Sequence, residues 1–191
     1  MSEYLPDGTE LTGTGWALQN PKDYIDVLKY IIPEAVAQSG VSSKDIIGIG
    51  LDFTSCTMLP VDENNVPLCL LVKNVSRPHA WVKLWKHHGA QKQADEINEL
   101  LKKRGEIDNI QFGGKISSEL LLPKILQIVE EDPELYDEAA SFLEVGDWLT
   151  QILTNGRKRS GNLAGYKAMW TPETGYPSKD FLLQLSPKLE N

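Results

Sequence analysis

Small polar side chains gather at the end of an apolar run in IGIGLDFTSCTMLPVD, residues 46–61. Asp52, Thr54, Ser55 and Thr57 follow one another within six positions. In open α/β sheets, ligands bind outside the carboxyl ends of the strands, where small hydroxyl side chains can hydrogen-bond a hydroxylated substrate. A turn whose hydroxyls satisfy only their own backbone explains the same composition. On position alone, a polyol site and a plain turn are equally good interpretations.

A second group of reactive side chains lies in RPHAWVKLWKHH, which holds all three histidines of the chain. His87 and His88 are adjacent, so they point to different sides of a helix, and His79 stands eight positions before His87. A helical zinc site instead uses histidines at i and i+4, so no metal site is predicted here. Trp81 and Trp85 lie one helical turn apart, which favours core packing. Aromatic faces beside charged groups also suit a sugar.

Two lysines follow glycines. FGGKIS lacks the first glycine and the final Ser/Thr of a phosphate loop, because Asn109 and Ile116 stand at those positions, so it predicts a turn. In AGYKAMW, Lys167 stands close to Tyr166 and Trp170 and is well placed to reach into a cleft. No nucleophile elbow supports a Ser–His–Asp or Cys–His triad.

The composition bounds the class of protein. The 191 residues are 41% hydrophobic and 24% charged, which is ordinary for one domain with a sizeable core. A net charge of −8 argues against a surface that binds nucleic acid. No segment has the apolar length that crosses a membrane, and the amino terminus lacks a signal-peptide pattern. Cys56 and Cys69 fit neither a metal site nor a disulfide framework, so we expect reduced thiols in a cytoplasmic protein.

The elements that must position these residues alternate between helix and strand, which predicts an α/β layer domain. Asn20 as N-cap, Pro21 at the first position and Gly40 at the end delimit a helix, whose apolar face is expected to point inward. The run DIIGIGLDF, residues 45–53, predicts a strand covered on both faces. We also expect loop or extended chain over residues 1–20 and a hairpin of TMLPVD and VPLCLLV. Further helices are expected over about residues 80–104, from Ser117 or Ser118 to Pro133 with Pro123 in the first turn, from an Asp147 cap to Gly156, and near residues 177–185.

Taken together, several stretches resemble one family in the same order. They are WALQNPKDYIDVL, IIGIGLDFTSCTMLPVDENNVPLCL, HAWVKLWKHHGAQ, GGKISSE with PKILQI, FLEVGDWLTQILTNG and AGYKAMW. From about Tyr4 to Leu189 the chain resembles the amino-terminal domain of the FGGY carbohydrate kinases, and DFTSCTMLP, WVKLWKHH and GYKAMW are similar to the ribulokinase branch. The resemblance implies an actin-like, ribonuclease-H-like ATPase domain, with a mixed sheet flanked by helices.

The same resemblance implies a reaction and a site. ATP with Mg²⁺ phosphorylates the 5-hydroxyl of L-ribulose, a step of arabinose catabolism in the cytoplasm. Ser55 matches a small residue whose backbone contacts the ketose, and Lys167 matches a lysine that reaches the sugar. Asp52 is implied to order the turn rather than to act as the base. Further candidates near the cleft are Thr54, Arg77, His79 and Trp81.

The chain also departs from the family pattern. Nothing before Tyr4 supplies the Asp-x-Gly-Thr strand pair that faces the ATP phosphates. The resemblance implies a second, ATP-side domain that carries the catalytic aspartate, and we do not expect residues 1–191 to include it, so no catalytic residue and no metal ligand is assigned here. Residues 1–191 are therefore expected to form a single incomplete sugar-binding domain, which is inactive when isolated.

Two alternatives stay open. One is a stand-alone, non-catalytic sugar-binding or interaction module, whose exposed cleft face would suit self-association as a homodimer. The other is a kinase for another ketopentose such as xylulose. Neither reading invokes a nucleic acid or a membrane as partner.

Overall fold

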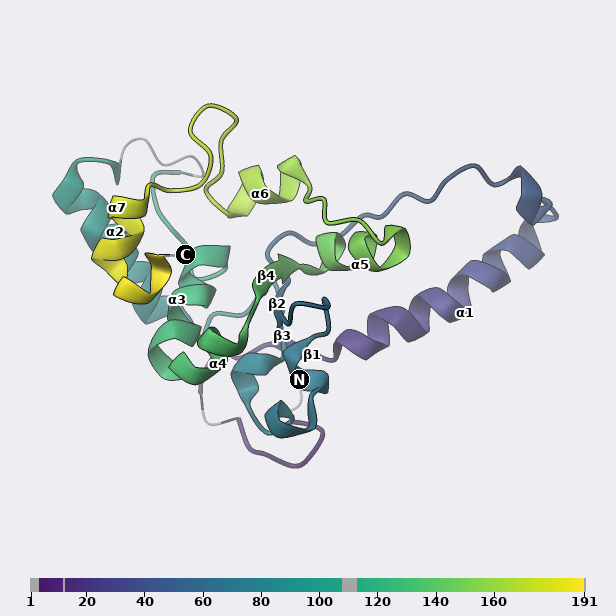
Figure 1. Cartoon of the computed structure of the whole chain (residues 1–191), viewed down its shortest axis with the longest axis horizontal. Helices are drawn as coiled ribbons and strands as arrows, with labels where there is room; N and C mark the ends of the chain where they lie inside the picture. Colours follow the sequence, from purple (N-terminus) through teal and green to yellow (C-terminus); the bar gives the residue numbers. More distant parts are fainter. Residues whose placement is uncertain (1–3, 12, 108–112, 191) are drawn as a thin grey trace.

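A small antiparallel sheet lies at the centre of the computed structural model, which describes residues 4–11, 13–107 and 113–190 (Figure 1). The strand order is β1-β3-β2-β4. The strands are β1 (Leu18–Gln19), β2 (Met58–Val61), β3 (Val82–Lys83) and β4 (Ser141–Glu144). The longest pairing joins β2 to β4, from Met58 opposite Glu144 to Val61 opposite Ser141. All pairs between these strands are antiparallel, and the expected run at residues 45–53 contributes no strand to the sheet.

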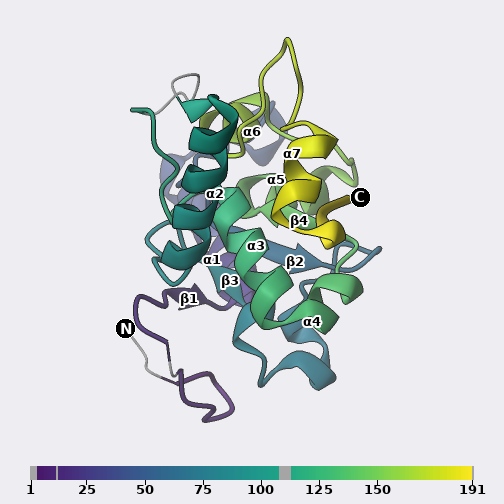
Figure 2. The same cartoon turned by 90° about the vertical axis from the view of Figure 1, so that its left-hand side faces the viewer.

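Helices cover both faces of this sheet. They are α1 (Pro21–Ser39), α2 (Gln91–Arg104), α3 (Leu121–Glu131), α4 (Pro133–Glu138), α5 (Val145–Thr154), α6 (Gly161–Lys167) and α7 (Lys179–Leu185). Figure 2 shows α2, α3, α4 and α7 in front of the sheet, with α1 and α5 behind it. Side chains alternate along β2 accordingly, because Met58 joins the core on the α2–α3 side and Leu59 joins the core around α5. None of the helices in the described part of the chain is long and apolar enough to cross a membrane.

Helix α1 begins and ends where its local signals predict. Asn20 accepts a hydrogen bond from the Lys22 backbone N–H at 3.0 Å, and Gly40 adopts the left-handed conformation with φ of 68°. The prediction that its apolar face points inward is wrong over most of its length. Figure 1 shows α1 reaching away from the sheet, so only the first turns pack on the core and Val27 and Ile31 are about half exposed.

Residues 46–54 form no strand, so the prediction for this run is wrong. A strand exists only where its N–H and C=O groups pair with a neighbour, and no described strand lies beside this run. Ile47 and Ile49 are exposed as a result. Strand β2 begins only at Met58, so the polar residues at 54–57 precede a strand instead of ending one.

Two further elements are shorter than predicted. The expected hairpin keeps its first strand and its turn, where Asp62 accepts hydrogen bonds from the Asn64 and Val66 backbones, but the second limb forms the 3₁₀ turns Leu68–Leu70 and Val72–Asn74. The helix expected from about residue 80 begins at Gln91, because the chain before it forms the 3₁₀ turn Pro78–Ala80 and strand β3. Trp85, expected inward, is 40% exposed.

The helix starts in the second half differ in detail. Helix α3 has Leu120 as its N-cap instead of Ser117 or Ser118, although Pro123 lies in its first turn as predicted. Helix α5 follows Glu144 directly, and Asp147 instead accepts a hydrogen bond from the Ser160 N–H at 2.7 Å. Asn155 in the left-handed conformation, not Gly156, ends α5. The last helix, α7, lies where it was predicted. A 3₁₀ turn, Pro187–Glu190, follows it.

Candidate functional site

The Ser55 turn, residues 54–57, lies immediately before β2. The Thr54 and Thr57 hydroxyls are 2.9 Å apart, and the Thr57 hydroxyl accepts the Trp85 backbone N–H at 3.2 Å. Ser55 is partly exposed, while Cys56 is buried and has a left-handed φ of 67°. The Thr54 and Thr57 hydroxyls thus bond to each other and to the Trp85 backbone, and Ser55 remains partly exposed at the surface of the turn.

Lys167 meets this turn from the other end of the chain. It is the last residue of α6. Its carbonyl oxygen lies 3.9 Å from the Cys56 sulfur, across 111 positions of sequence. Its side chain is 20% exposed, and its Nζ lies 3.6 Å from Glu119 Oε2. The structure therefore brings the end of α6 against Cys56, the neighbour of Ser55 in the turn.

The Glu119 carboxylate lies between Lys167 and His88. Its other oxygen, Oε1, lies 3.6 Å from His88 Nε2, and His88 Nδ1 lies 3.3 Å from the Ser118 hydroxyl. The Glu119 and Lys167 side chains are both partly exposed, so their charges face solvent and can meet a polar ligand. The sequence carried no spacing that indicated Glu119, since its partners lie far away along the chain.

Lys124 and Glu144 lie beneath the turn and were also missed. Lys124 Nζ donates to the Cys56 carbonyl at 2.6 Å and to the Leu84 carbonyl at 2.8 Å. Glu144 Oε2 accepts the Cys56 N–H at 2.7 Å. The one available signal was a lysine in an apolar stretch, LLPKILQIV, where a solvated side chain is not expected.

Burial shifts the pKa values of Lys124, Glu144 and Cys56. Desolvation lowers the pKa of Lys124 to about 8 and raises the pKa of Glu144 to about 7. Desolvation, with the nearby Glu144 carboxylate, raises the pKa of the Cys56 thiol to about 12. Cys56 therefore stays a neutral thiol at pH 7, which suits a packing residue and not a nucleophile.

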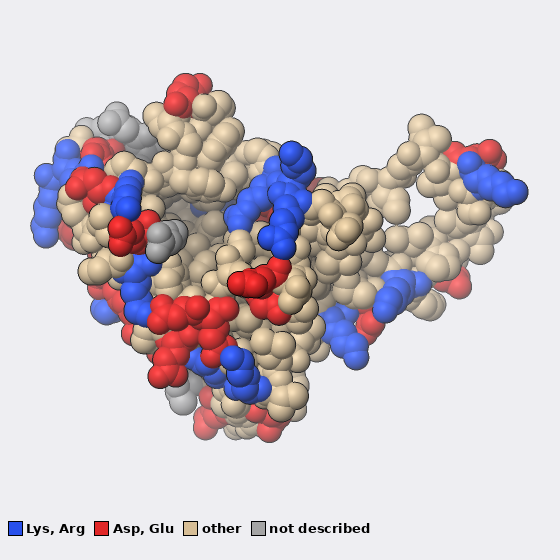
Figure 3. Space-filling model, in the orientation of Figure 1, with Lys and Arg blue, Asp and Glu red and all other residues tan. Residues whose placement is uncertain are grey.

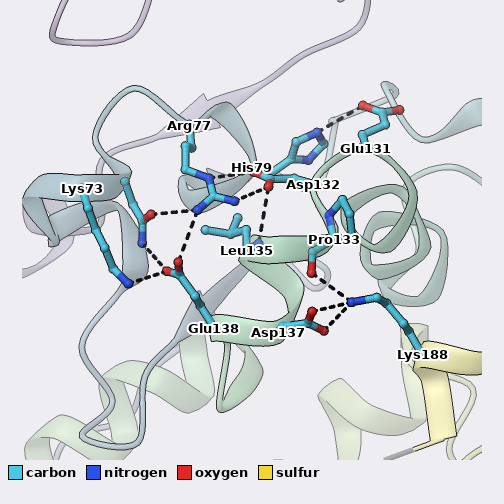
Figure 4. A network of polar contacts seen from close by, with 11 residues as sticks. Lys73, Arg77, His79, Glu131, Asp132, Pro133, Leu135, Asp137, Glu138 and Lys188 are labelled. Atoms are coloured by element: carbon cyan, nitrogen blue, oxygen red, sulfur yellow. Dashed lines mark hydrogen bonds and ion pairs between the residues drawn. The ribbon is translucent and has the colours of Figure 1, made fainter.

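Arg77 and His79 lie in a different polar network (Figure 4). Arg77 donates to both carboxylate oxygens of Asp132 and lies 3.5 Å from Glu138 Oε1. His79 Nε2 lies 3.1 Å from Glu131 Oε2. This network joins the Pro78–Ala80 turn to α3 and α4.

Trp81 is buried, and its indole N–H donates to the Val75 carbonyl at 3.0 Å. Within the described ranges, no hydrogen bond or ion pair joins Arg77, His79 or Trp81 to the Ser55 turn or to Lys167. A part for these three residues in sugar binding stays a prediction.

Among residues 4–11, 13–107 and 113–190, no group of three or more His, Cys, Asp or Glu side chains could hold a metal ion. Gly113 and Gly114 have positive φ, as the predicted turn requires, and Lys115 is exposed. Asn109 lies outside the described residues.

A hollow of about 770 Å³ lies beside the site, between α3, α4, β4 and α7. Its floor is apolar, with Ile125, Phe142 and Leu182, and its edge carries charges of both signs (Figure 3). Ala168, the neighbour of Lys167, contributes to its wall, whereas Ser55 does not. The hollow therefore approaches the candidate sugar site without including it.

Comparison with known proteins gives the family. Residues 3–164 match the FGGY family of carbohydrate kinases, N-terminal domain. The chain is 53% identical over 187 residues to a ribulokinase of Bacillus licheniformis and 48% identical over 191 residues to one of Halalkalibacterium halodurans, which covers 98% and 100% of the chain. The chain spans about a third of the length of these relatives, 34% in each case.

Solved structures agree on the fold. A xylulose kinase from Brucella ovis superposes with a TM-score of 0.67 at 18% identity, over 92% of this chain and 34% of its own. A gluconate kinase from Lactobacillus acidophilus superposes with a TM-score of 0.68 at 16% identity, over 94% and 33%. Because the family match covers most of the residues and the folds agree, the chain belongs to the FGGY family of carbohydrate kinases.

Proposed function

We propose that the chain is the sugar-binding part of a longer, ATP-dependent kinase that converts L-ribulose to L-ribulose 5-phosphate in the cytoplasm. Relatives named ribulokinase, 47% to 53% identical over at least 98% of the chain, support this substrate. Xylulose and gluconate are the sugars of fold neighbours below 20% identity, so L-ribulose is favoured over them. The observation that carries the proposal is the contact between the Cys56 sulfur and the Lys167 carbonyl oxygen, because it brings the turn that contains Ser55 near the end of α6.

In this proposal the chain binds and orients the ketose. The Lys167 ammonium, held beside Glu119, donates a hydrogen bond to a sugar hydroxyl. The backbone at Ser55 approaches the sugar closely, because a small side chain there leaves room. Bound ATP with Mg²⁺ would supply the phosphoryl group and the neutralising charge. Because the Glu119 carboxylate at this place is paired with Lys167 and His88, deprotonation of the 5-hydroxyl is assigned to another carboxylate, in the remainder of the longer kinase.

A second candidate function is a non-catalytic module that binds sugar or another copy of itself. One observation favours it: large apolar side chains on α1 and in the segment after it are exposed. They are Val27, Tyr30, Ile31, Ile47 and Ile49. Dimerisation through this face, together with weak L-ribulose binding and no ADP release in the longer protein, would favour the module.

Replacement of Lys167 tests the proposed function. In the longer kinase, Lys167→Ala should raise KM for L-ribulose by about tenfold or more, because a hydrogen bond from a charged donor contributes roughly 1.5–3 kcal/mol. The matched control is Lys158→Ala, which removes an exposed lysine from the segment before α6. Circular dichroism should show the same fold for both variants. Unchanged KM and kcat in Lys167→Ala would remove Lys167 from the site.

A further inference from the structure

Cys56 holds an unusual backbone conformation at the centre of the candidate site. Its φ of 67° lies in the left-handed region, which residues with a Cβ rarely adopt. Asn65, Asn155 and Met169 share this region, and the two asparagines tolerate it because their side chains bond locally. A cysteine side chain does not make such a local hydrogen bond, so other groups must stabilise the left-handed conformation of Cys56.

Two buried, oppositely charged side chains hold this one residue. Glu144, at the junction of β4 and α5, accepts the Cys56 N–H at 2.7 Å. Lys124, from the first half of α3, donates to the Cys56 carbonyl at 2.6 Å. Side chains from β4 and α3 therefore meet at the two backbone polar groups of a single residue, just before β2.

Both charges are placed where packing alone does not need them. Lys124 is fully buried on the apolar face of α3, where a leucine or methionine would fill the space at no desolvation cost. Glu144 is 5% exposed, and its Oε1 is buried with no hydrogen-bond partner among the described residues. The Cys56 N–H is thus the one group, in the described ranges, that donates a hydrogen bond to this carboxylate.

We propose that Lys124 and Glu144 are positioning residues: together they hold Cys56 in the left-handed conformation and so fix the backbone of Ser55 against the sugar. The inference rests on the proposed function, because it assigns to these two residues the geometry of the same sugar site. Neither side chain touches the substrate. Their effect is transmitted through Cys56 to the adjacent peptide.

The test uses Lys124→Met in the longer kinase. Loss of the ammonium frees the Cys56 carbonyl, so KM for L-ribulose should rise by between about tenfold and a hundredfold while kcat changes far less. Adding Cys56→Gly should return KM towards the wild-type value, because glycine adopts positive φ without a clamp. A purely structural role for Lys124 gives no such rescue. Lys103→Met, an exposed lysine of α2, is the matched control.

A second pair of variants, at Glu144, tests the proposal even if Lys124→Met folds poorly. Glu144→Met removes the acceptor of the Cys56 N–H and should show the same rise in KM and the same rescue by Cys56→Gly. A wild-type KM in either single variant, or no rescue in either double variant, would overturn the clamp.

A crystal structure of each variant gives a readout without activity. We expect residue 56 to leave the positive φ region in Lys124→Met and to keep it in the double variant. If residue 56 keeps its φ in Lys124→Met, the clamp is overturned. If the wild-type kinase is inert with L-ribulose but φ changes as expected, the clamp stands and the proposed substrate falls.

Discussion

His87 should make the folded chain sensitive to acid. It is buried, its Nδ1 accepts the Ala17 N–H at 3.2 Å, and its Nε2 lies 3.1 Å from Gln127 Oε1. This pairing suits the neutral imidazole, with the proton on Nε2 donated to the Gln127 oxygen. Burial, and then the nearby Lys83, lower the pKa of His87 from 6.5 to about 2.

The size of the effect follows from this difference in pKa. Because the folded chain binds the His87 proton only near pH 2 and the unfolded chain binds it near pH 6.5, acid stabilises the unfolded chain. Stability is therefore lost as the pH falls below about 6.5. Between about pH 7.5 and 5.5 the loss from this one residue is about 1.3 kcal/mol.

Urea unfolding of wild type and His87→Gln measures this loss. The substitution itself costs stability at every pH, but only the wild type carries the titrating group. The difference in unfolding free energy between the two proteins should therefore shrink by about 1.3 kcal/mol from about pH 7.5 to 5.5. The matched control is His88→Gln, the same substitution at a histidine whose side chain is 56% exposed.

A constant difference for His87→Gln over this pH range would refute the reasoning. It would mean that His87 takes up a proton in the folded chain as readily as in the unfolded one. The close approach of Trp16, whose ring centroid lies 4.9 Å from that of His87, would then not exclude water from the imidazole.

Two more predictions concern Glu144 and the isolated chain. Because burial raises the pKa of Glu144 from 4.5 to about 7, its proton stabilises the folded chain, and this contribution, up to about 3 kcal/mol, is lost as the pH rises from 4.5 to 7. Glu144→Gln should flatten that part of the stability curve in urea unfolding, and an unchanged slope would contradict the assignment. Residues 1–191 alone should release ADP from ATP only at the background rate of a coupled assay, whereas release that depends on L-ribulose would show that the chain is self-sufficient.

Local signals predicted the elements that local chemistry determines. Asn20, Pro21 and Gly40 fixed both ends of α1, because capping depends on neighbours in sequence. The run at residues 45–53 had strand composition, but a strand also needs a partner that sequence patterns cannot supply. The spacing of Trp81 and Trp85 imitated a helix, although hydrogen bonds to β1 and β2 hold that segment as β3.

The residues of the candidate site also divide into those that the sequence predicted and those that it did not. Ser55 and Lys167 were predicted through motifs that resemble a family. The structure places Cys56, the neighbour of Ser55, 3.9 Å from the Lys167 carbonyl oxygen, and their part in sugar binding stays a prediction. Lys124 and Glu144 were not predicted, because their importance comes from one distant residue, Cys56, in a conformation that composition does not reveal. Buried charges are expensive, so a lysine inside an apolar helix is the pattern to look for.

The most direct test of the central claim is a sugar panel assayed with the longer kinase that carries this chain. ADP release is measured with L-ribulose, D-ribulose and xylulose as acceptors, at concentrations that give kcat/KM for each. We predict the highest kcat/KM for L-ribulose and a product phosphorylated at the 5-hydroxyl. No release above the sugar-free background with L-ribulose, or a higher kcat/KM for xylulose, would contradict the proposed function.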